Sequence, residues 1–139
     1  MILLDTNVLL RMTAADSKIG ERSRYLIDEG VHDDGVGVSA VVFLEAARLH
    51  WDEKANLGMP PEAWRKAHLR RGLLEIPLTG DIAIQAADLY ARQGFHRDPG
   101  DQIIVATAIS SRSTLATTDH NILQWAAKTK MVTVLDATE

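Results

Sequence analysis

Short apolar runs alternate with longer segments of helical periodicity along almost the whole chain. The runs that we predict to be β-strands are residues 2–4, 36–38, 74–76, 115–117 and 132–135. Strands that alternate with helices pair in parallel, because a parallel connection needs a crossover long enough to hold a helix. The pattern therefore predicts an α/β fold in which a central parallel sheet of about five strands is covered by helices on both faces.

Capping residues mark the ends of most predicted helices. The first helix is expected to begin at Asn7, and the others to cover residues 17–29 with Asp16 or Ser17 as the cap, 41–53, 61–72, 80–94 with Thr79 as the cap, 99–109 with Asp98 as the cap, and 120–129 with Asp119 as the cap. The segment IIVATAI is apolar on nearly every side. The helix that contains it is therefore expected to be central.

Composition limits the chain to a few classes of protein. A length of 139 residues predicts a single domain over residues 1–139. The absence of Cys excludes disulfides and thiolate zinc sites, and it favours the cytoplasm as the location. No apolar stretch is long enough for a bilayer, and the N-terminal residues lack the pattern of a signal peptide, so we expect no membrane association.

Four acidic residues interrupt segments that otherwise have the composition of a protein core. Asp5 ends the first apolar run in MILLDTNVLLRM, and Glu45 lies inside VSAVVFLEAARL. Asp101 lies in DPGDQIIVATA, and Asp119 follows LATT. Because the carboxyl ends of parallel strands are where open α/β sheets place their chemistry, we expect these acids to converge. Converging carboxylates repel one another unless a cation is present, so the pattern predicts a metal site.

Each acid also has a structural interpretation. Asp5 and Asp119 are favourable helix N-caps. Glu45 has apolar helical neighbours, and a buried carboxylate without a partner is costly enough to need a cation or a shifted pKa. Asp98, directly before Pro99, is the better cap of its helix, which leaves Asp101 in the first turn with its side chain free for a metal.

Other polar residues receive weaker functional assignments. Thr6, Asn7, Thr117 and Thr118 are expected to support the carboxylates through hydrogen bonds, although these residue types are equally ordinary in turns. The five His residues lack zinc-binding spacing and are expected at the surface or at the edge of the core. The basic segment WRKAHLRRG has two interpretations, a solvated helix face or a surface that contacts a phosphate backbone.

The net charge of −4 argues weakly against a protein that binds nucleic acid through bulk charge alone. Without the four candidate site acids, however, the count of Asp and Glu falls from 19 to 15 and equals the 15 Lys and Arg. Divalent cations at the acidic cluster would also offset its repulsion of a phosphate. The overall acidity therefore does not exclude a polyanionic substrate.

The order of four motifs, LLDTNVLL, the isolated Glu45, HRDPGDQIIVATA and LATTD, resembles PIN-domain ribonucleases, and among them the VapC toxins of bacterial and archaeal toxin–antitoxin pairs. The resemblance covers nearly the whole chain. It places the invariant acids of the family on Asp5, Glu45, Asp101 and Asp119, with Asp98 as the helix-opening acid. One departure is Gln102, where many relatives have Arg, and it puts a local ion pair or phosphate contact in doubt.

The resemblance implies a PIN-like α/β/α sandwich and a metal-dependent endoribonuclease that cleaves single-stranded or structured RNA such as tRNA, rRNA or mRNA. It implies Mg²⁺ or Mn²⁺ as the cofactor, a cognate VapB-like antitoxin as a partner and a homodimer. We expect Asp5 and Asp101 to hold the principal metal and Asp119 to complete its coordination. Glu45 is expected to orient water or to help hold a second ion.

Three alternatives remain open from the sequence. Haloacid dehalogenase-type phosphatases also begin with Asp after a first strand, but they need a second Asp at the position occupied here by Asn7. A receiver domain needs an acidic pair near the first strand and a phosphoacceptor Asp after the third, and neither pattern is convincing. The third alternative is a catalytically silent PIN-like binding module, which the complete acidic set disfavours.

Overall fold

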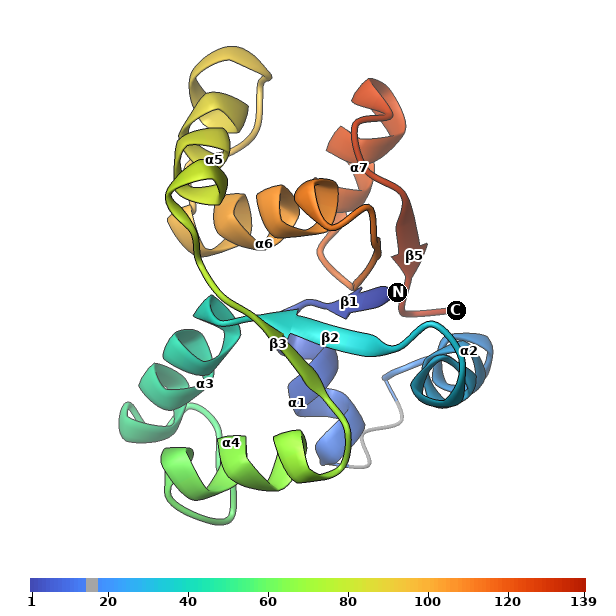
Figure 1. The fold of residues 1–139 in the computed structure, drawn as a ribbon, viewed down its shortest axis with the longest axis vertical. Helices are drawn as coiled ribbons and strands as arrows, with labels where there is room; N and C mark the ends of the chain where they lie inside the picture. The colour runs from blue at the N-terminus through green and yellow to red at the C-terminus, as the bar shows by residue number, and fades with distance from the viewer. Residues whose placement is uncertain (15–17) are drawn as a thin grey trace.

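The computed structural model describes residues 1–14 and 18–139, and these form a five-stranded sheet with helices on both faces (Figure 1). All strand pairs are parallel, and the strand order is β3-β2-β1-β4-β5. The strands are β1 (Ile2–Leu4), β2 (Val36–Ser39), β3 (Leu74–Ile76), β4 (Thr114–Thr117) and β5 (Val134–Asp136). The predicted α/β/α fold with a parallel sheet of about five strands is confirmed.

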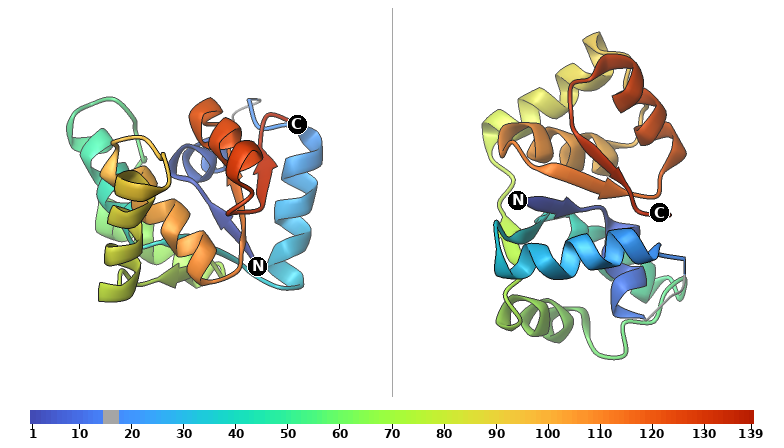
Figure 2. Two further views of the ribbon diagram at one scale, coloured as in Figure 1. Left: turned by 90° about the horizontal axis from the view of Figure 1, so that it is seen from above. Right: turned by 90° about the vertical axis from the view of Figure 1, so that its right-hand side faces the viewer.

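Seven helices within the described ranges connect or follow the strands. They are α1 (Thr6–Thr13), α2 (Glu21–His32), α3 (Val41–Trp51), α4 (Pro61–Arg70), α5 (Gly80–Arg92), α6 (Pro99–Ser110) and α7 (His120–Thr129). Helices α5, α6 and α7 lie on one side of the sheet, and α1, α2 and α4 lie on the other (Figures 1 and 2). Helix α3 contacts both α1 and α6, so it brings together residues from the two layers at one edge of the sheet.

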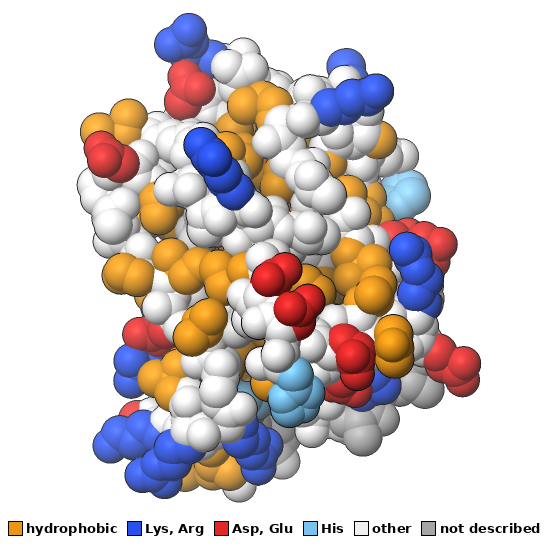
Figure 3. All heavy atoms as spheres, turned by 45° about the vertical axis from the view of Figure 1, so that its right-hand side comes forward, with side chains coloured by type: hydrophobic (Ala, Val, Ile, Leu, Met, Phe, Trp, Pro, Cys, Tyr) orange, Lys and Arg blue, Asp and Glu red, His pale blue; other side chains and the backbone are white. Residues whose placement is uncertain are grey.

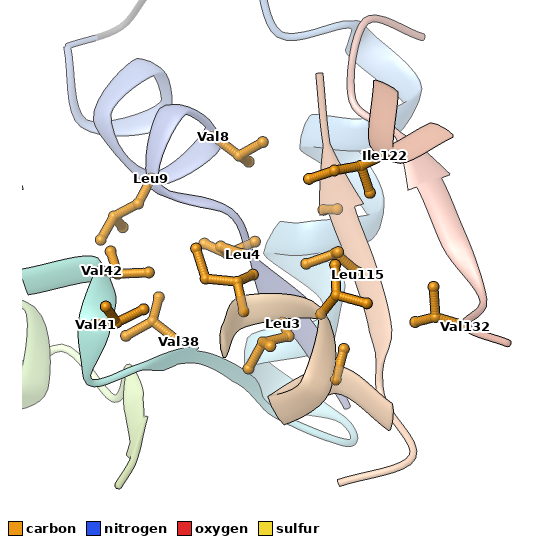
Figure 4. Close-up of a cluster of buried hydrophobic side chains, with 14 of the residues drawn as sticks. Leu3, Leu4, Val8, Leu9, Val38, Val41, Val42, Leu115, Ile122 and Val132 are labelled. Carbon is orange, nitrogen blue, oxygen red and sulfur yellow. The ribbon is translucent and has the colours of Figure 1, made fainter. Parts of the chain in front are cut away.

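The core lies on both faces of strand β1. Leu3 and Leu4 of this strand and Leu115 of β4 are at most 2% exposed, and Val8, Val38 and Val42 pack around them (Figure 4). Burying an aliphatic side chain of this size stabilises a fold by roughly 1.5–3 kcal/mol. Helix α6 is buried from Ile104 to Ala108, which confirms the prediction that the IIVATAI helix is central.

Most of the predicted caps are present. Oδ1 of Asp5 accepts a hydrogen bond from Thr6 N, so α1 begins at Thr6, one residue earlier than predicted. Thr79, Asp98 and Asp119 accept hydrogen bonds from backbone N–H groups in the first turns of α5, α6 and α7. These hydrogen bonds satisfy N–H groups that have no partner within their own helix.

Several boundaries differ from the predictions by one or more residues, and the starts of α2 and β5 are two of them. Helix α2 begins at Glu21 rather than residue 17, with Gly20 in an extended conformation as its N-cap, and the proposed caps Asp16 and Ser17 lie outside the described residues. Strand β5 begins at Val134 rather than residue 132. Val132 is buried without pairing, because the chain leaves α7 through the left-handed Lys130 (φ 57°) and packs against the core before the ladder starts. The apolar residue Val132 therefore reflects burial in the core and not pairing in the sheet.

Candidate active site

The topology brings two acidic residues to neighbouring strand ends. Asp5 follows β1 and Asp119 follows β4, and these strands are adjacent in the sheet although distant in the sequence. This is the point at which the strand order reverses, and open α/β sheets bind ligands in the crevice at the carboxyl ends of such strands. Asp5 and Asp119 thus lie at the position that the architecture favours for a site.

Helices α3 and α6 supply the remaining acids. Glu45 comes from the second turn of α3 and Asp101 from the first turn of α6. The four acids line one cleft of about 420 Å³, and the complete lining is Asp5, Thr6, Asn7, Glu45, Arg48, Leu49, Asp52, Asp98, Asp101 and Asp119. Every acid that the sequence singled out therefore reaches the same cleft.

No helix within the described ranges is long and apolar enough to cross a membrane.

Asp5 is fixed by hydrogen bonds at both carboxylate oxygens. Thr6 N donates to Oδ1 over 2.8 Å, and Thr117 Oγ1 donates to Oδ2 over 2.7 Å. The same Thr117 oxygen accepts a hydrogen bond from Asp119 N, 3.0 Å away. Thr117 therefore links the two strand-end acids. Within the described residues, the threonines that hydrogen-bond Asp5 and Glu45 are Thr6 and Thr117, and no such hydrogen bond comes from Thr118.

Glu45 is held between the start of α1 and the start of α6. Thr6 Oγ1 donates to Oε1 of Glu45 over 2.5 Å. The other carboxylate oxygen lies so close to Gly100 that a Cβ on this glycine would overlap it. The absence of a side chain at position 100 therefore makes room for the carboxylate.

Asp101 has a partner that the sequence reasoning missed. Nε2 of His96 lies 2.8 Å from Oδ2 of Asp101, although the histidines were expected only at the surface or at the edge of the core. Gln102, the departure from the family pattern, is buried, and its Nε2 donates to the carbonyl oxygen of His96 over 2.9 Å. The side chain of Gln102 thus turns toward the backbone before α6. The one signal in the sequence was the position of His96 in HRDPGD, five residues before Asp101.

Burial raises the pKa values of three cleft acids. It raises the pKa of Asp5 to about 6, against the opposing effect of the hydrogen bond from Thr117. It also raises the pKa of Glu45 to about 6, against the opposing hydrogen bond from Thr6. The pKa of Asp101 is raised by burial as well, and the hydrogen bond with His96 opposes the shift. Each of the three is also repelled by other acids in the cleft, which raises its pKa further. The ionised carboxylates therefore have too little positive charge near them.

The donor set fits a hard divalent cation. Glu45, Asp98 and Asp101 each offer a carboxylate oxygen, and these oxygens lie within 4.8 Å of one another. Oxygen ligands are those that Mg²⁺, Mn²⁺ and Ca²⁺ prefer. The sequence expectation was Asp5, Asp101 and Asp119 as ligands, with Asp98 as a cap. The structure groups Asp98 with Asp101 and Glu45 in addition to its capping hydrogen bond with Gly100 N.

The arrangement of acids agrees with the family that the motifs resemble. The family model of the PIN domain matches residues 2–128. The chain belongs to the PIN domain family. Among curated proteins, this PIN domain is similar to Ribonuclease VapC22 of Mycobacterium tuberculosis (strain ATCC 25618 / H37Rv). The two are 28% identical over 121 residues, which cover 87% of this chain and 88% of the relative.

Solved structures share the fold of this PIN domain. VapBC2 from Rickettsia felis, bound to a DNA fragment from its promoter, superposes with a TM-score of 0.68 at 18% identity over 97% of this chain and 98% of that chain. FitAB bound to an IR36 DNA fragment superposes with a TM-score of 0.67 at 24% identity, over 100% of this chain and 96% of that chain. VapBC-1 from nontypeable Haemophilus influenzae superposes with a TM-score of 0.65 at 19% identity, over 100% of both chains.

Two further charged residues line the cleft of this PIN domain without having been predicted. Arg48 lies three positions after Glu45 on α3, and Asp52, the C-cap of this helix, lies seven positions after it, so helical spacing places all three on one face. That spacing was visible in the sequence. Arg48 is exposed and makes no ion pair with the residues that the structure describes. It therefore brings an uncompensated positive charge to the rim of an acidic cleft.

The basic segment WRKAHLRRG lies elsewhere. It forms most of α4, and in Figure 3 Lys and Arg side chains gather at the lower end of the molecule, where α4 lies in Figure 1. Arg65 makes two hydrogen bonds to Glu75, and His68 is buried against Trp64. No residue of this segment lines the acidic cleft that the described residues form.

Proposed function

We propose that this PIN domain is a metal-dependent endoribonuclease and acts as the toxin of a toxin–antitoxin pair. The observation that carries the proposal is the convergence of Asp5, Glu45, Asp101 and Asp119 in one cleft, with burial raising the pKa values of the first three. The similarity to a curated ribonuclease of the VapC type supports RNA as the substrate. The reaction is cleavage of a phosphodiester bond in single-stranded or structured RNA, such as tRNA, rRNA or mRNA.

The carboxylates divide into holding and orienting groups. Asp5 and Asp101 would hold the cation, and Asp119 and Asp98, which lie in the same cleft, would complete the ligand set. When bound there, Mg²⁺ or Mn²⁺ lowers the pKa of water and neutralises charge on the phosphate. Glu45, whose Oε1 is fixed by Thr6, orients the attacking water and accepts its proton. No side-chain nucleophile is required.

Arg48 gives the cleft a contact for the substrate backbone. Its exposed guanidinium carries the positive charge that a phosphate needs at the entrance to an acidic site. Phosphate contacts position a nucleic acid without reading its sequence. We therefore assign to Arg48 the placement of the RNA backbone, with specificity left to the shape of the groove.

Partner binding follows from the charge of the same cleft. An antitoxin segment with Arg side chains complements a negative groove, and the neighbouring structures include a toxin–antitoxin complex from Klebsiella pneumoniae. We propose a VapB-like antitoxin as the partner, a homodimer as the assembly and the cytoplasm as the place of action. Co-purification with light scattering tests the partner and the assembly. A strictly monomeric protein that does not bind the antitoxin encoded beside it contradicts both.

The choice of ion tests the proposed chemistry. Metal-free protein is titrated with Mg²⁺, Mn²⁺, Ca²⁺ or Zn²⁺ at fixed pH while cleavage of a structured RNA and of a single-stranded RNA is followed. Mg²⁺ and Mn²⁺ are expected to restore activity, because an all-carboxylate site favours them over Zn²⁺. Ca²⁺ is expected to bind with poor turnover, since its looser coordination aligns water and phosphate less well. Full activity in EDTA, or equal activity with Ca²⁺ and Mg²⁺, overturns the mechanism. A protein that binds Mn²⁺ but cleaves no RNA is the silent binding module.

A further inference from the structure

The loop between α5 and α6 is anchored at successive residues. Trp125 Nε1 donates to the carbonyl oxygen of Gln93 over 2.9 Å. Phe95 N donates to the carbonyl oxygen of Leu89 over 3.0 Å, and the buried Phe95 ring packs edge-on against Trp125, with ring centroids 5.0 Å apart. These contacts fix the backbone on which His96 stands.

The His96 side chain and carbonyl are held as well. Its ring stacks on Phe95, with ring centroids 4.2 Å apart and an interplanar angle of 27°. Its carbonyl oxygen accepts the hydrogen bond from Nε2 of the buried Gln102. The imidazole is consequently fixed by ring stacking and by a backbone anchor before it contacts Asp101.

The imidazole contacts the carboxylate of Asp101, which lines the acidic cleft. Nε2 of His96 lies 2.8 Å from Oδ2 of Asp101, and the side chains are 29% and 15% exposed. With Asp101 ionised, Nε2 carries the proton and donates it in the hydrogen bond. One oxygen of Asp101 is thus engaged by protein, which fixes the plane of the carboxylate and leaves Oδ1 outside this bond.

We propose that His96 is a positioning residue that orients Asp101 for the divalent cation, and that Gln102 sets the position of His96. This inference rests on the proposed function, because it concerns the same metal site. A ligand whose orientation is already fixed loses less conformational freedom on binding than a free one. Removing a partner that hydrogen-bonds a metal ligand typically weakens metal affinity or activity by about 10–100-fold.

The test compares Mn²⁺ affinity, measured by calorimetry, in wild type, His96→Ala, His96→Gln and Gln102→Met. His96→Ala is expected to weaken Mn²⁺ binding by about 10-fold. His96→Gln is expected to bind within about 3-fold of wild type, because its amide N–H can take the place of Nε2–H. Gln102→Met removes the anchor of His96 while leaving the Asp101 side chain in place, and it is expected to weaken binding by about 10-fold, at the lower end of that range. His32→Ala, an exposed histidine at the end of α2, is the matched control.

A purely structural role for His96 predicts a different result. Thermal melts of the metal-free variants would then show lower melting temperatures, while Mn²⁺ affinity would remain that of wild type. Wild-type affinity in His96→Ala, or a folded His96→Gln as impaired as His96→Ala, overturns the inference alone. If His96→Ala does not fold, wild-type affinity in Gln102→Met overturns it. Absence of Mn²⁺ binding by the wild-type protein contradicts the proposed function and this inference together.

Discussion

Glu75 and Asp5 are both carboxylates on the parallel sheet, yet their pKa values move in opposite directions. Glu75, in edge strand β3, accepts two hydrogen bonds from Arg65 over 2.6 and 2.7 Å, and this hydrogen bonding lowers its pKa. Asp5, at the end of central strand β1, is 5% exposed, and burial raises its pKa to about 6. Its hydrogen-bond donors are neutral groups of Thr6 and Thr117.

The two residues differ in the charge beside the carboxylate. Glu75 is paired with the cation Arg65, whereas the proposed function gives Asp5 a metal cation from solution. The Arg65–Glu75 pair is partly exposed, so screening by water and salt limits its contribution to stability. Asp5 carries the cost of burial in a cleft with other acids. Strongly perturbed acids in a cleft are typical of functional sites, whereas satisfied surface pairs are not. The same contrast predicts which substitutions change activity and which change only stability.

Gly100→Ala is expected to have the largest effect among substitutions that leave every carboxylate in place. The new Cβ would overlap the Oε2 of Glu45, and this flexible carboxylate would move away rather than disrupt the fold. We expect RNA cleavage to fall by about 10–100-fold, in the range observed when a positioned catalytic group is misplaced. The melting temperature should stay the same or rise, because Ala is a better helix former than Gly.

Gly80→Ala is the matched control for this experiment. Gly80 is also in the first turn of a helix, α5, and a Cβ on it meets no atom within 4 Å among those described. Cleavage rates of the two variants are measured at saturating Mg²⁺. Wild-type activity in Gly100→Ala would mean that the position of Glu45 does not matter for the reaction.

Stability of the metal-free protein gives a smaller but opposite pair of effects. Asp5→Asn is expected to raise the free energy of unfolding at pH 7–8 by about 3 kcal/mol, because it removes an ionised carboxylate whose burial is unfavourable. Glu75→Gln is expected to lower it slightly, because it breaks the hydrogen-bonded ion pair with Arg65. Urea denaturation of both variants in EDTA measures the two effects. A destabilised Asp5→Asn protein would contradict the origin assigned to the raised pKa.

The pH dependence extends the same measurement. Between pH 3.8 and about 6 the folded protein binds more protons at Asp5 than the unfolded chain does, so the free energy of unfolding contributed by this residue falls as pH rises. Asp5→Asn should therefore flatten the wild-type profile in this window. Glu75 has a lowered pKa, so its contribution is present above pH 4.5 and is lost as pH falls through its folded pKa.

The sequence predicted the parts of the fold and site that depend on local pattern. Apolar runs located all five strands, and Asp5, Asp98 and Asp119 were recognised as caps as well as candidate site residues. Acids that end a strand or interrupt an apolar helix can be recognised in the sequence, because burying a carboxylate in a core is unfavourable unless the residue has a partner or a function. The convergence of Glu45 with the strand-end acids followed from the same argument.

The parts that the sequence did not predict depend on the path of loops and on helix faces. The contact between His96 and Asp101 needs the α5–α6 loop to fold back, which Trp125 achieves from 32 residues away by binding Gln93. The role of Gln102 likewise depends on a carbonyl whose direction no local pattern encodes. Arg48 was accessible from helical spacing and was overlooked, because a charged residue on an exposed helix face is ordinary.

The most direct test of the central claim is the initial rate of RNA cleavage by purified wild type, Asp5→Asn and Glu75→Gln in Mg²⁺. Asp5→Asn is expected to lose at least about 10³-fold in rate while remaining folded, because in the proposed mechanism it removes a ligand of the catalytic cation. Glu75→Gln, which loses a carboxylate outside the cleft, is expected to keep the wild-type rate. Wild-type cleavage by a purified Asp5→Asn protein free of contaminating nuclease would contradict the assignment of the acidic cleft as the active site.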